Sequence, residues 1–166
     1  GVDLQIIHIT DDPISIWLDD LRVPEGEFGE IVVAGPMATR EYYGLPDANS
    51  LAKIADGDRI WHRIGDIGYR DHEGRIWFCG RKAHRVVTEN GTMYSVCCEA
   101  IFNEHPDVQR SALVGIGPKN HQQPVIIIEP EPGRLQTGTR AASFIDEMLK
   151  LAKTSELTTP INKVFL

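Results

Sequence analysis

Short apolar runs that are repeatedly broken by turn residues dominate the first 80 positions of the sequence. β-branched and aromatic residues fill the runs, and Gly, Pro, Asp and Asn separate them, which is typical of strands joined by tight turns. The predicted strands cover residues 4–9, 14–18, 31–34, 61–63 and 75–79. One helical turn is predicted at residues 50–54. This pattern favours a small antiparallel sheet or partial barrel.

From about residue 85 the pattern changes to strands that alternate with helices. A hairpin of residues 85–88 and 92–94 is predicted across residues 89–91, because an Asn-Gly pair favours a tight turn. Ser95 is the expected N-cap of a helix that ends near Glu104. The apolar face of that helix is expected to hold Val96, Ala100 and Ile101.

Strands are predicted again at residues 110–116 and 124–129, and a loop follows at residues 129–139. Residues 140–153 then repeat apolar side chains at helical spacing, which predicts an amphipathic helix. Its apolar face holds Phe144, Ile145, Met148, Leu149 and Ala152. A last strand is predicted at residues 161–166.

The two patterns together predict an α+β fold in two parts. Residues 1–80 form a small antiparallel β-subdomain. Residues 85–166 form a compact α+β domain, with a two-stranded hairpin and a sheet of roughly three strands flanked by helices. Residues 81–84 connect the two parts.

Charge and composition argue against several classes of function. Seventeen basic and 24 acidic residues give a formal net charge of −7, whereas binding to nucleic acid or to anionic membranes needs a basic footprint. No apolar run approaches the roughly 18 residues of a membrane-spanning helix. The first residues also lack the basic and apolar regions of a signal peptide.

The cysteines and histidines predict neither a metal centre nor a nucleophilic triad. Cys79, Cys97 and Cys98 lack the spacing of zinc ligands, and the six histidines show no ligand-like spacing. An odd number of cysteines with an adjacent pair favours reduced thiols in a cytoplasmic protein. Both ends of the chain lie in strand-like segments and the first residue is not Met, so we expect a piece of a longer protein.

The stretch "HRIGDIGYRDHEGRIWFCGRK" places an acidic and a basic residue at the two ends of a predicted hairpin. Asp66 could accept two hydrogen bonds from a vicinal diol such as a ribose, or it could cap backbone N–H groups in a turn. Arg81 could donate to the same ligand, or it could be an exposed charge after a strand. Gly91 is the residue type that a tight hairpin turn needs. Glu99 is consistent with a solvated acid in the first turn of its helix, where the helix dipole favours negative charge.

Several motifs in this order resemble the adenylate-forming superfamily of acyl-CoA synthetases, luciferases and peptide-synthetase adenylation domains. The resemblance rests on "GEIVVAGPMATREYY", "WHRIGDIGYRDHEGRIWFCGRK" and "CCEAIFNEHPDVQRSALVGI", with the Gly91 hairpin before the last of them. Within that superfamily, "REYYGLPDANSLAKI" and "WFCGRKAHRV" look most like the β-lactone synthetases of bacterial olefin biosynthesis. A fatty-acyl or aryl-CoA ligase is the alternative.

The resemblance implies that Asp66 and Arg81 bind the ribose of ATP and of the acyl-adenylate. It also implies that residues 1–80 end a large AMP-binding domain and that residues 85–166 form most of a mobile cap. Lys82, Ala83 and His84 then form the hinge, and Gly91 lies in a loop that approaches the active site after the cap has turned.

The implied parent enzyme uses ATP and Mg²⁺ to activate a carboxylic acid, here a long-chain 3-hydroxy fatty acid, as acyl-AMP. It would then close a β-lactone. The family's phosphate-binding loop and acyl pocket lie upstream of Gly1, and its catalytic lysine lies beyond Leu166, so the resemblance implies that the isolated chain is inactive, has no catalytic residue and binds no cofactor tightly.

Two departures from the family pattern affect these expectations. Ala83 stands where relatives usually carry Asp or Lys, so the polar hinge contact would have to come from Lys82 or His84. Residues 96–99 lack the usual Pro and acidic residues, which disfavours a standard coenzyme A tunnel. A hypothesis of a different class is a stand-alone module that docks a carrier protein or a pathway enzyme.

Overall fold

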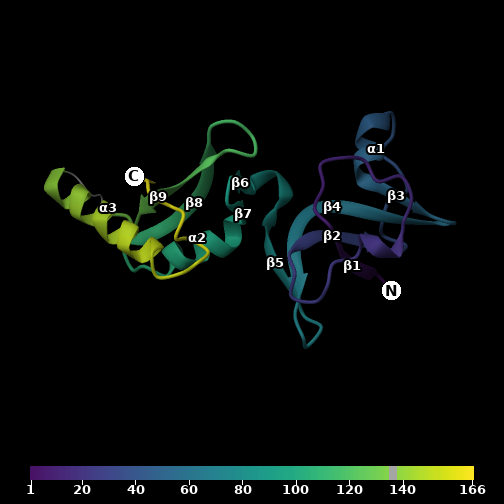
Figure 1. The fold of residues 1–166 in the computed structure, drawn as a ribbon, viewed down its shortest axis with the longest axis horizontal. Coiled ribbons are helices and arrows are strands. Elements are labelled where there is room, and N and C mark those ends of the chain that lie inside the picture. Colours follow the sequence, from purple (N-terminus) through teal and green to yellow (C-terminus); the bar gives the residue numbers. More distant parts are fainter. Residues whose placement is uncertain (135–137) are drawn as a thin grey trace. The chain divides into compact units, whose positions relative to one another are not determined.

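A computed structural model describes residues 1–134 and 138–166, and these form two compact units (Figure 1). The first unit is Gly1–Ala83 and the second is His84–Leu166. The first is built on an antiparallel sheet, and the second combines a hairpin, a three-stranded sheet and helices. The predicted α+β class is therefore confirmed. Part of the loop predicted at residues 129–139 lies outside the described residues.

Five antiparallel strands form the sheet of the first unit. They are β1 (Asp3–Ile7), β2 (Gly29–Ala34), β3 (Lys53–Asp56), β4 (Arg59–Arg70) and β5 (Ile76–Arg81). The order is β1-β2-β4-β3, and β5 also pairs with β4. Strand β2 runs along one edge of β4, so β3 and β5 follow one another along the other edge.

The core of the first unit explains why the strand predicted at residues 14–18 was wrong. Trp61 of β4 is buried, and Trp17 stacks on it with ring centroids 4.5 Å apart. The segment around Trp17 is a loop that joins the sheet through one bridge, between Ile16 and Ala55, before a 3₁₀ turn at Asp19–Leu21. Its apolar residues serve packing rather than strand pairing, which an alternating pattern alone does not distinguish.

The helical turn predicted at residues 50–54 is also displaced. Helix α1 is Pro46–Ala52, with Pro46 in its first turn, where a fixed φ and a missing N–H are tolerated. Lys53 and Ile54 instead start β3 and pair with β4. Ile54 is fully buried in this sheet, so its tertiary packing overrides the local helical preference.

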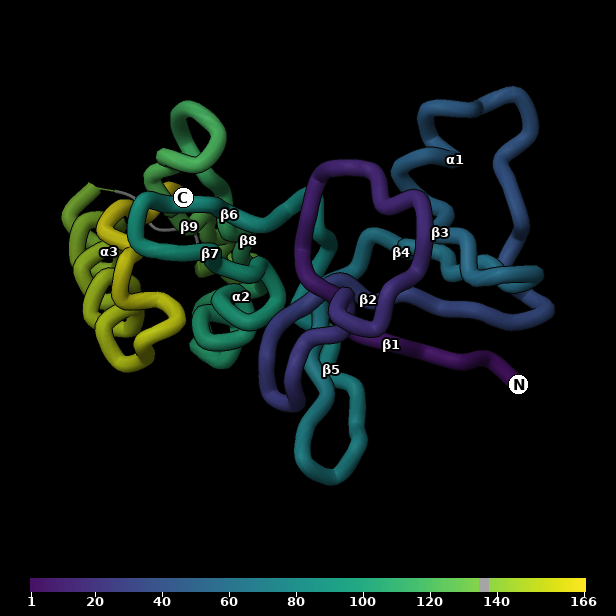
Figure 2. Tube along the Cα trace, turned by 45° about the vertical axis from the view of Figure 1, so that its right-hand side comes forward, coloured from purple at the N-terminus to yellow at the C-terminus, as the bar shows by residue number. Residues whose placement is uncertain are grey.

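The second unit contains the remaining elements (Figure 2). They are β6 (Val86–Thr88), β7 (Gly91–Met93), α2 (Ser95–Asn103), β8 (Val108–Ile116), β9 (Gln123–Pro130), α3 (Gly138–Ala152) and β10 (Val164–Phe165). β6 and β7 form the predicted hairpin, and β8 pairs with β9 as predicted. The last predicted strand shortens to β10, which lies parallel to β9.

One core joins the sheet and both helices of the second unit. Phe144, Met148 and Ala152 of α3 are buried in it, which confirms the predicted apolar face of this helix. The predicted face of α2 was wrong, because Cys98 and Phe102 are the apolar residues that enter the core. The exposed residues of α2 include Val96 and Ala100.

The start of α2 also differs from its prediction. Tyr94 occupies the N-cap position, and Ser95 is a buried first helical residue without a capping hydrogen bond. Glu99, expected to be a solvated acid, accepts a hydrogen bond from the backbone N–H of Leu113 at 2.9 Å. The Ser111 hydroxyl donates to the backbone carbonyl of Glu99, so α2 is fixed to β8 by polar contacts as well as by the core.

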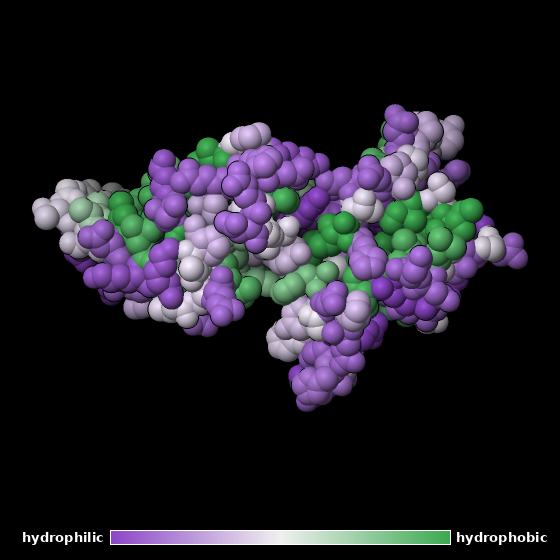
Figure 3. All heavy atoms as spheres, viewed as in Figure 1, coloured by the Kyte–Doolittle hydropathy of each residue, from purple (hydrophilic) through white to green (hydrophobic). Residues whose placement is uncertain are grey.

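Hydrophobic residues also reach the surface of each unit (Figure 3). Within residues 1–134 and 138–166, no helix combines the length and the apolar character needed to cross a membrane.

Candidate functional site

Pairing of β4 with β5 brings together Asp66 and Arg81, the acidic and the basic residue of the stretch at residues 62–82. Asp66 and Arg81 stand directly opposite each other in the register. Arg81 Nη1 donates to Asp66 Oδ1 at 2.7 Å. The Arg81 side chain is 56% exposed and the Asp66 side chain is 21% exposed, so the pair can be reached from solvent. Two residues that are 15 positions apart along the chain thus form one acidic–basic pair at the surface.

Irregularities in the sheet flank Asp66 on both sides. The pairing of β2 with β4 passes from Ile31 opposite Asp66 to Val32 opposite Arg63, so two residues of β4 bulge out. A further register shift follows Ile67 in the pairing with β5. Bulges redirect side chains and are common beside functional sites. Here one irregularity comes directly before Asp66, and the other comes one residue after it.

Gly65, one of the bulged residues, has φ +76, a conformation that side chains with a Cβ rarely adopt. We expect Gly65→Ala to destabilise the first unit by about 1–2 kcal/mol. The matched control is Gly74→Ala at the hairpin turn, where φ is +79 and the added methyl would meet nothing within 4 Å. Denaturant unfolding followed by tryptophan fluorescence should give similar losses for both variants. An unchanged stability of Gly65→Ala would contradict this conformational argument.

The turn between β4 and β5 is organised by a single carboxylate. The Trp77 indole Nε1 and Arg75 Nε both donate to Asp71 Oδ2 at 2.7 Å. The backbone N–H groups of Glu73 and Arg75 donate to Asp71 Oδ1 at 3.0 and 2.9 Å. The Arg75 guanidinium also lies over the Trp77 ring. This network fixes the far end of the hairpin that carries Asp66 and Arg81.

The hydrogen bond from Trp77 is the main cause that lowers the pKa of Asp71 well below the ordinary value, and the donors from Arg75 and Glu73 act in the same direction. The turn is therefore stabilised above a pH of about 4 and loses this contribution as the pH falls through the lowered pKa. In a carbon NMR titration, Asp71 should stay ionised at a pH where ordinary aspartates are half protonated. Trp77→Phe should move its pKa upward, and a normal pKa in the unaltered chain would contradict the assignment.

A buried charge cluster lies beneath the connection to the second unit, and the sequence analysis missed it. Glu30 is 1% exposed and Arg63 is 4% exposed. Arg63 Nη2 and Lys82 Nζ donate to the same oxygen, Glu30 Oε2, at 2.8 and 3.0 Å. The available signal was a carboxylate directly before the β-branched run of β2. We call Glu30, Arg63 and Lys82 the buried charge cluster.

The residues expected to form a hinge make one 3₁₀ turn, Lys82–His84. Ala83 is exposed and is the last residue of the first unit, and His84 is the first residue of the second. The Lys82 side chain is directed into the buried charge cluster of the first unit.

Gly91 lies at the surface where the hairpin of the second unit turns. It has φ +139, and no atom lies within 4 Å of a methyl added there. Thr88 pairs with Gly91, so the loop holds only Glu89 and Asn90. Asn120 is the one non-glycine residue with positive φ in the described parts of the chain, so Asn90 does not adopt the left-handed conformation of the expected Asn-Gly turn. In this turn, only Gly91 has a positive φ.

Comparison with known proteins decides the family. No family model matches the chain. Over 136 residues the chain is 48% identical to an olefin beta-lactone synthetase from Xanthomonas campestris, which covers 79% of this chain. It is also 36% identical over 103 residues to a 2-succinylbenzoate–CoA ligase from Geobacillus kaustophilus, which covers 62% of this chain. The chain belongs to the adenylate-forming ligase superfamily.

The fold agrees with this assignment. The O-succinylbenzoate coenzyme A synthetase from Bacillus subtilis, solved with ATP and a magnesium ion, matches 99% of this chain with a TM-score of 0.69 and 21% identity. The match covers 30% of that synthetase, and the chain spans 24% of the Xanthomonas enzyme. The chain thus corresponds to a minor part of the length of these relatives.

Two of the three cysteines are buried, which disfavours a role as nucleophiles. Cys79 and Cys98 are buried, and burial is the main cause that raises the pKa of the Cys98 thiol to about 12, with the neighbouring Cys97 and Glu99 acting in the same direction. Among the residues with described positions, no group of three or more His, Cys, Asp or Glu side chains is placed to hold a metal ion.

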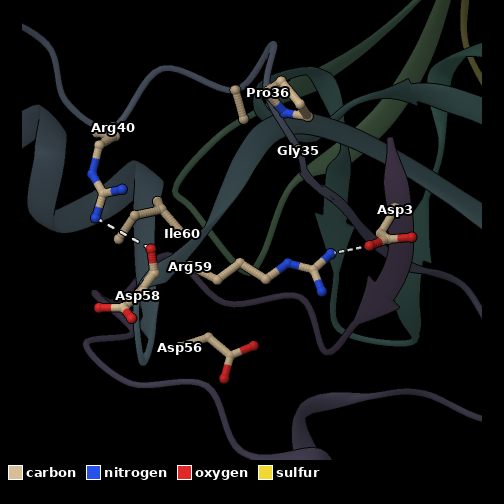
Figure 4. A pocket seen from close by; sticks show the side chains of 9 residues that line it. Asp3, Gly35, Pro36, Arg40, Asp56, Asp58, Arg59 and Ile60 are labelled. Carbon is tan, nitrogen blue, oxygen red and sulfur yellow. Dashed lines mark hydrogen bonds and ion pairs between the residues drawn. The ribbon is translucent and has the colours of Figure 1, made fainter. Parts of the chain in front are cut away.

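A separate hollow of about 600 Å³ lies on the first unit (Figure 4). Arg59 is paired there with Asp3, and Arg40 Nη2 donates to the Asp58 carbonyl at 3.3 Å. These arginines already have acceptors within the chain. Asp66 and Arg81 are not among the residues that line this hollow, so the two features are distinct.

Proposed function

We propose that the chain supplies the ribose-binding edge of an ATP-dependent ligase that forms an acyl-adenylate and then closes a β-lactone. The Asp66–Arg81 pair is the observation that carries the ribose assignment. Arg81 engages Oδ1 of Asp66, and among the described residues the Asp66 carboxylate has no other hydrogen bond or ion pair, so Oδ2 is available to a hydroxyl. A carboxylate with two acceptor oxygens suits the two neighbouring hydroxyls of a ribose.

The proposed chemistry has two steps. In the first, a substrate carboxylate oxygen attacks the α-phosphate of ATP and pyrophosphate leaves. In the second, the 3-hydroxyl oxygen of the same substrate attacks the acyl carbon, AMP leaves, and the hydroxyl proton passes to solvent. Asp66 and Arg81 hold the nucleotide in both steps, and Ala83 and Gly91 belong to the hinge and to the moving loop of the cap.

The substrate proposal rests on identity to an olefin beta-lactone synthetase, which is higher than identity to the succinylbenzoate ligase. We propose a long-chain 3-hydroxy fatty acid, because its own hydroxyl serves as the second nucleophile. Transfer of the acyl group to coenzyme A is the alternative, supported by the 36% identity to a CoA ligase. Magnesium is expected in the whole enzyme, and the described residues of this chain include no group of three or more His, Cys, Asp or Glu side chains placed to hold it.

The decisive experiment uses the full-length enzyme, a 3-hydroxy fatty acid and ATP, with and without coenzyme A. The proposal expects ATP–pyrophosphate exchange and a β-lactone whose formation does not need coenzyme A. The matched acid without the 3-hydroxyl should support exchange but yield no lactone. A thioester formed only with coenzyme A would establish the alternative, and no exchange with either acid would refute the adenylation proposal.

A further inference from the structure

The buried charge cluster places two cationic side chains on one carboxylate oxygen. Glu30 carries one negative charge, and Arg63 alone neutralises it with contacts from Nε at 3.2 Å and Nη2 at 2.8 Å. Lys82 adds a second positive charge at 3.0 Å from the same carboxylate oxygen. Lys82 is the member of this cluster that lies at the start of the connector.

The contacts of Lys82 connect two segments of the first unit to the start of the connector. Its Nζ donates to Glu30 in β2 and to the backbone carbonyl of Thr10, in the loop after β1, at 3.1 Å. The Arg63 guanidinium donates to the same Thr10 carbonyl and to the carbonyl of Asp12 at 2.9 Å. Only 19% of the Lys82 side chain is exposed. The first residue after β5 is thus held from the interior of the first unit.

We propose that Lys82 is a positioning residue that fixes the start of the connector to the first unit, so that turning of the second unit begins at Ala83. This inference rests on the proposed function, because it assumes a cap that turns between two reactions. It states that the residues up to Lys82 stay fixed to the first unit and that the residues after Lys82 are free to move. Arg81 lies directly before Lys82 and pairs with Asp66, so the anchor keeps the ribose-binding pair in place while the residues after Lys82 move.

The anchor can be tested in the chain itself, without catalysis. Lys82→Met removes the charge and keeps an unbranched side chain, and Arg63 still neutralises Glu30, so the first unit should remain folded. Amide hydrogen exchange at the end of β5 and in residues 82–84 should become at least about tenfold faster. Lys53→Met is the matched control, because Lys53 Nζ also donates within the first unit, to Thr39, but away from the connector. Unchanged exchange in Lys82→Met would refute the anchor.

The consequence for catalysis is tested in the full-length enzyme. We expect Lys82→Met to lower the kcat of lactone formation about fivefold, because the second pose is reached with less precision. The KM for ATP in pyrophosphate exchange should change less than about twofold, and Lys82→Arg should recover most of the kcat. An equal loss in both reactions would show a merely structural role and overturn the inference.

The failure of this inference can be distinguished from failure of the proposed function. If the unaltered full-length enzyme shows no pyrophosphate exchange, the proposed function fails, whereas the hydrogen-exchange result still decides whether Lys82 anchors the connector. If exchange and lactone formation both occur but Lys82→Met leaves the kcat of lactone formation unchanged, the proposed function stands and the positioning role is wrong.

Discussion

Replacement of Glu30 by glutamine is expected to destabilise the first unit by about 3–5 kcal/mol, because it removes the buried carboxylate to which both Arg63 and Lys82 donate. Glutamine is nearly the same size, so the loss reports on charge rather than on packing. All three tryptophans of the chain, at positions 17, 61 and 77, lie in the first unit. Their fluorescence during denaturant unfolding therefore follows this unit.

The control for Glu30→Gln is Glu27→Gln, three positions earlier, where the side chain is exposed. This variant should change the stability by less than about 0.5 kcal/mol. A second comparison combines Glu30→Gln with Lys82→Met. Removal of the Lys82 charge should recover part of the lost stability. A Glu30→Gln variant as stable as the unaltered chain would contradict the view that the cluster is ionised and electrostatically coupled.

The second large effect is expected for Asp66→Ala in the full-length enzyme. A hydrogen bond to a charged group contributes roughly 1.5–3 kcal/mol, so the KM for ATP should rise at least about tenfold. Asp66→Asn keeps one acceptor oxygen and should have a smaller effect. Steady-state pyrophosphate exchange at varied ATP concentration measures both variants.

The matched control for the ribose assignment is Asp58→Ala. Asp58 is an exposed aspartate of the first unit that lines the hollow of Figure 4 and lies apart from Arg81. Its removal should leave the KM for ATP within about twofold of the unaltered enzyme. If Asp66→Ala and Asp58→Ala behaved alike, or if Asp66→Ala left the KM unchanged, the assignment of Asp66 to the ribose would be wrong.

Local sequence patterns predicted the elements whose residues are used in the way that their spacing suggests. The apolar face of α3 agrees with its helical spacing, because that helix covers a sheet with a single stripe. The β8–β9 pair and the β6–β7 hairpin agree with their predicted strands, although the hairpin turn places its positive φ at Gly91 and not at Asn90. The predicted apolar face of α2 was wrong. Phe102 is fully buried in the core, and the side of the helix that carries it faces inward.

The sequence predicted some residues of the candidate site and missed others. Asp66 and Arg81 were singled out in sequence as the ends of a hairpin, and the strand register places them opposite each other. Glu30, Arg63 and Lys82 were not grouped, since they lie 33 and 52 positions apart along the chain and come from three different segments. A charge within a strand carries no local signal of the partner that will neutralise it.

The sequence by itself determined the α+β class, the order of the main elements and the motif that holds Asp66 and Arg81, because these follow from short-range spacing and turn chemistry. Only the tertiary structure decided the bulges that flank Asp66, the burial of a carboxylate between two cations, and the fixing of Lys82 beside the connector. Those features depend on the register of non-adjacent strands and on desolvation, and both arise only when distant segments pack together.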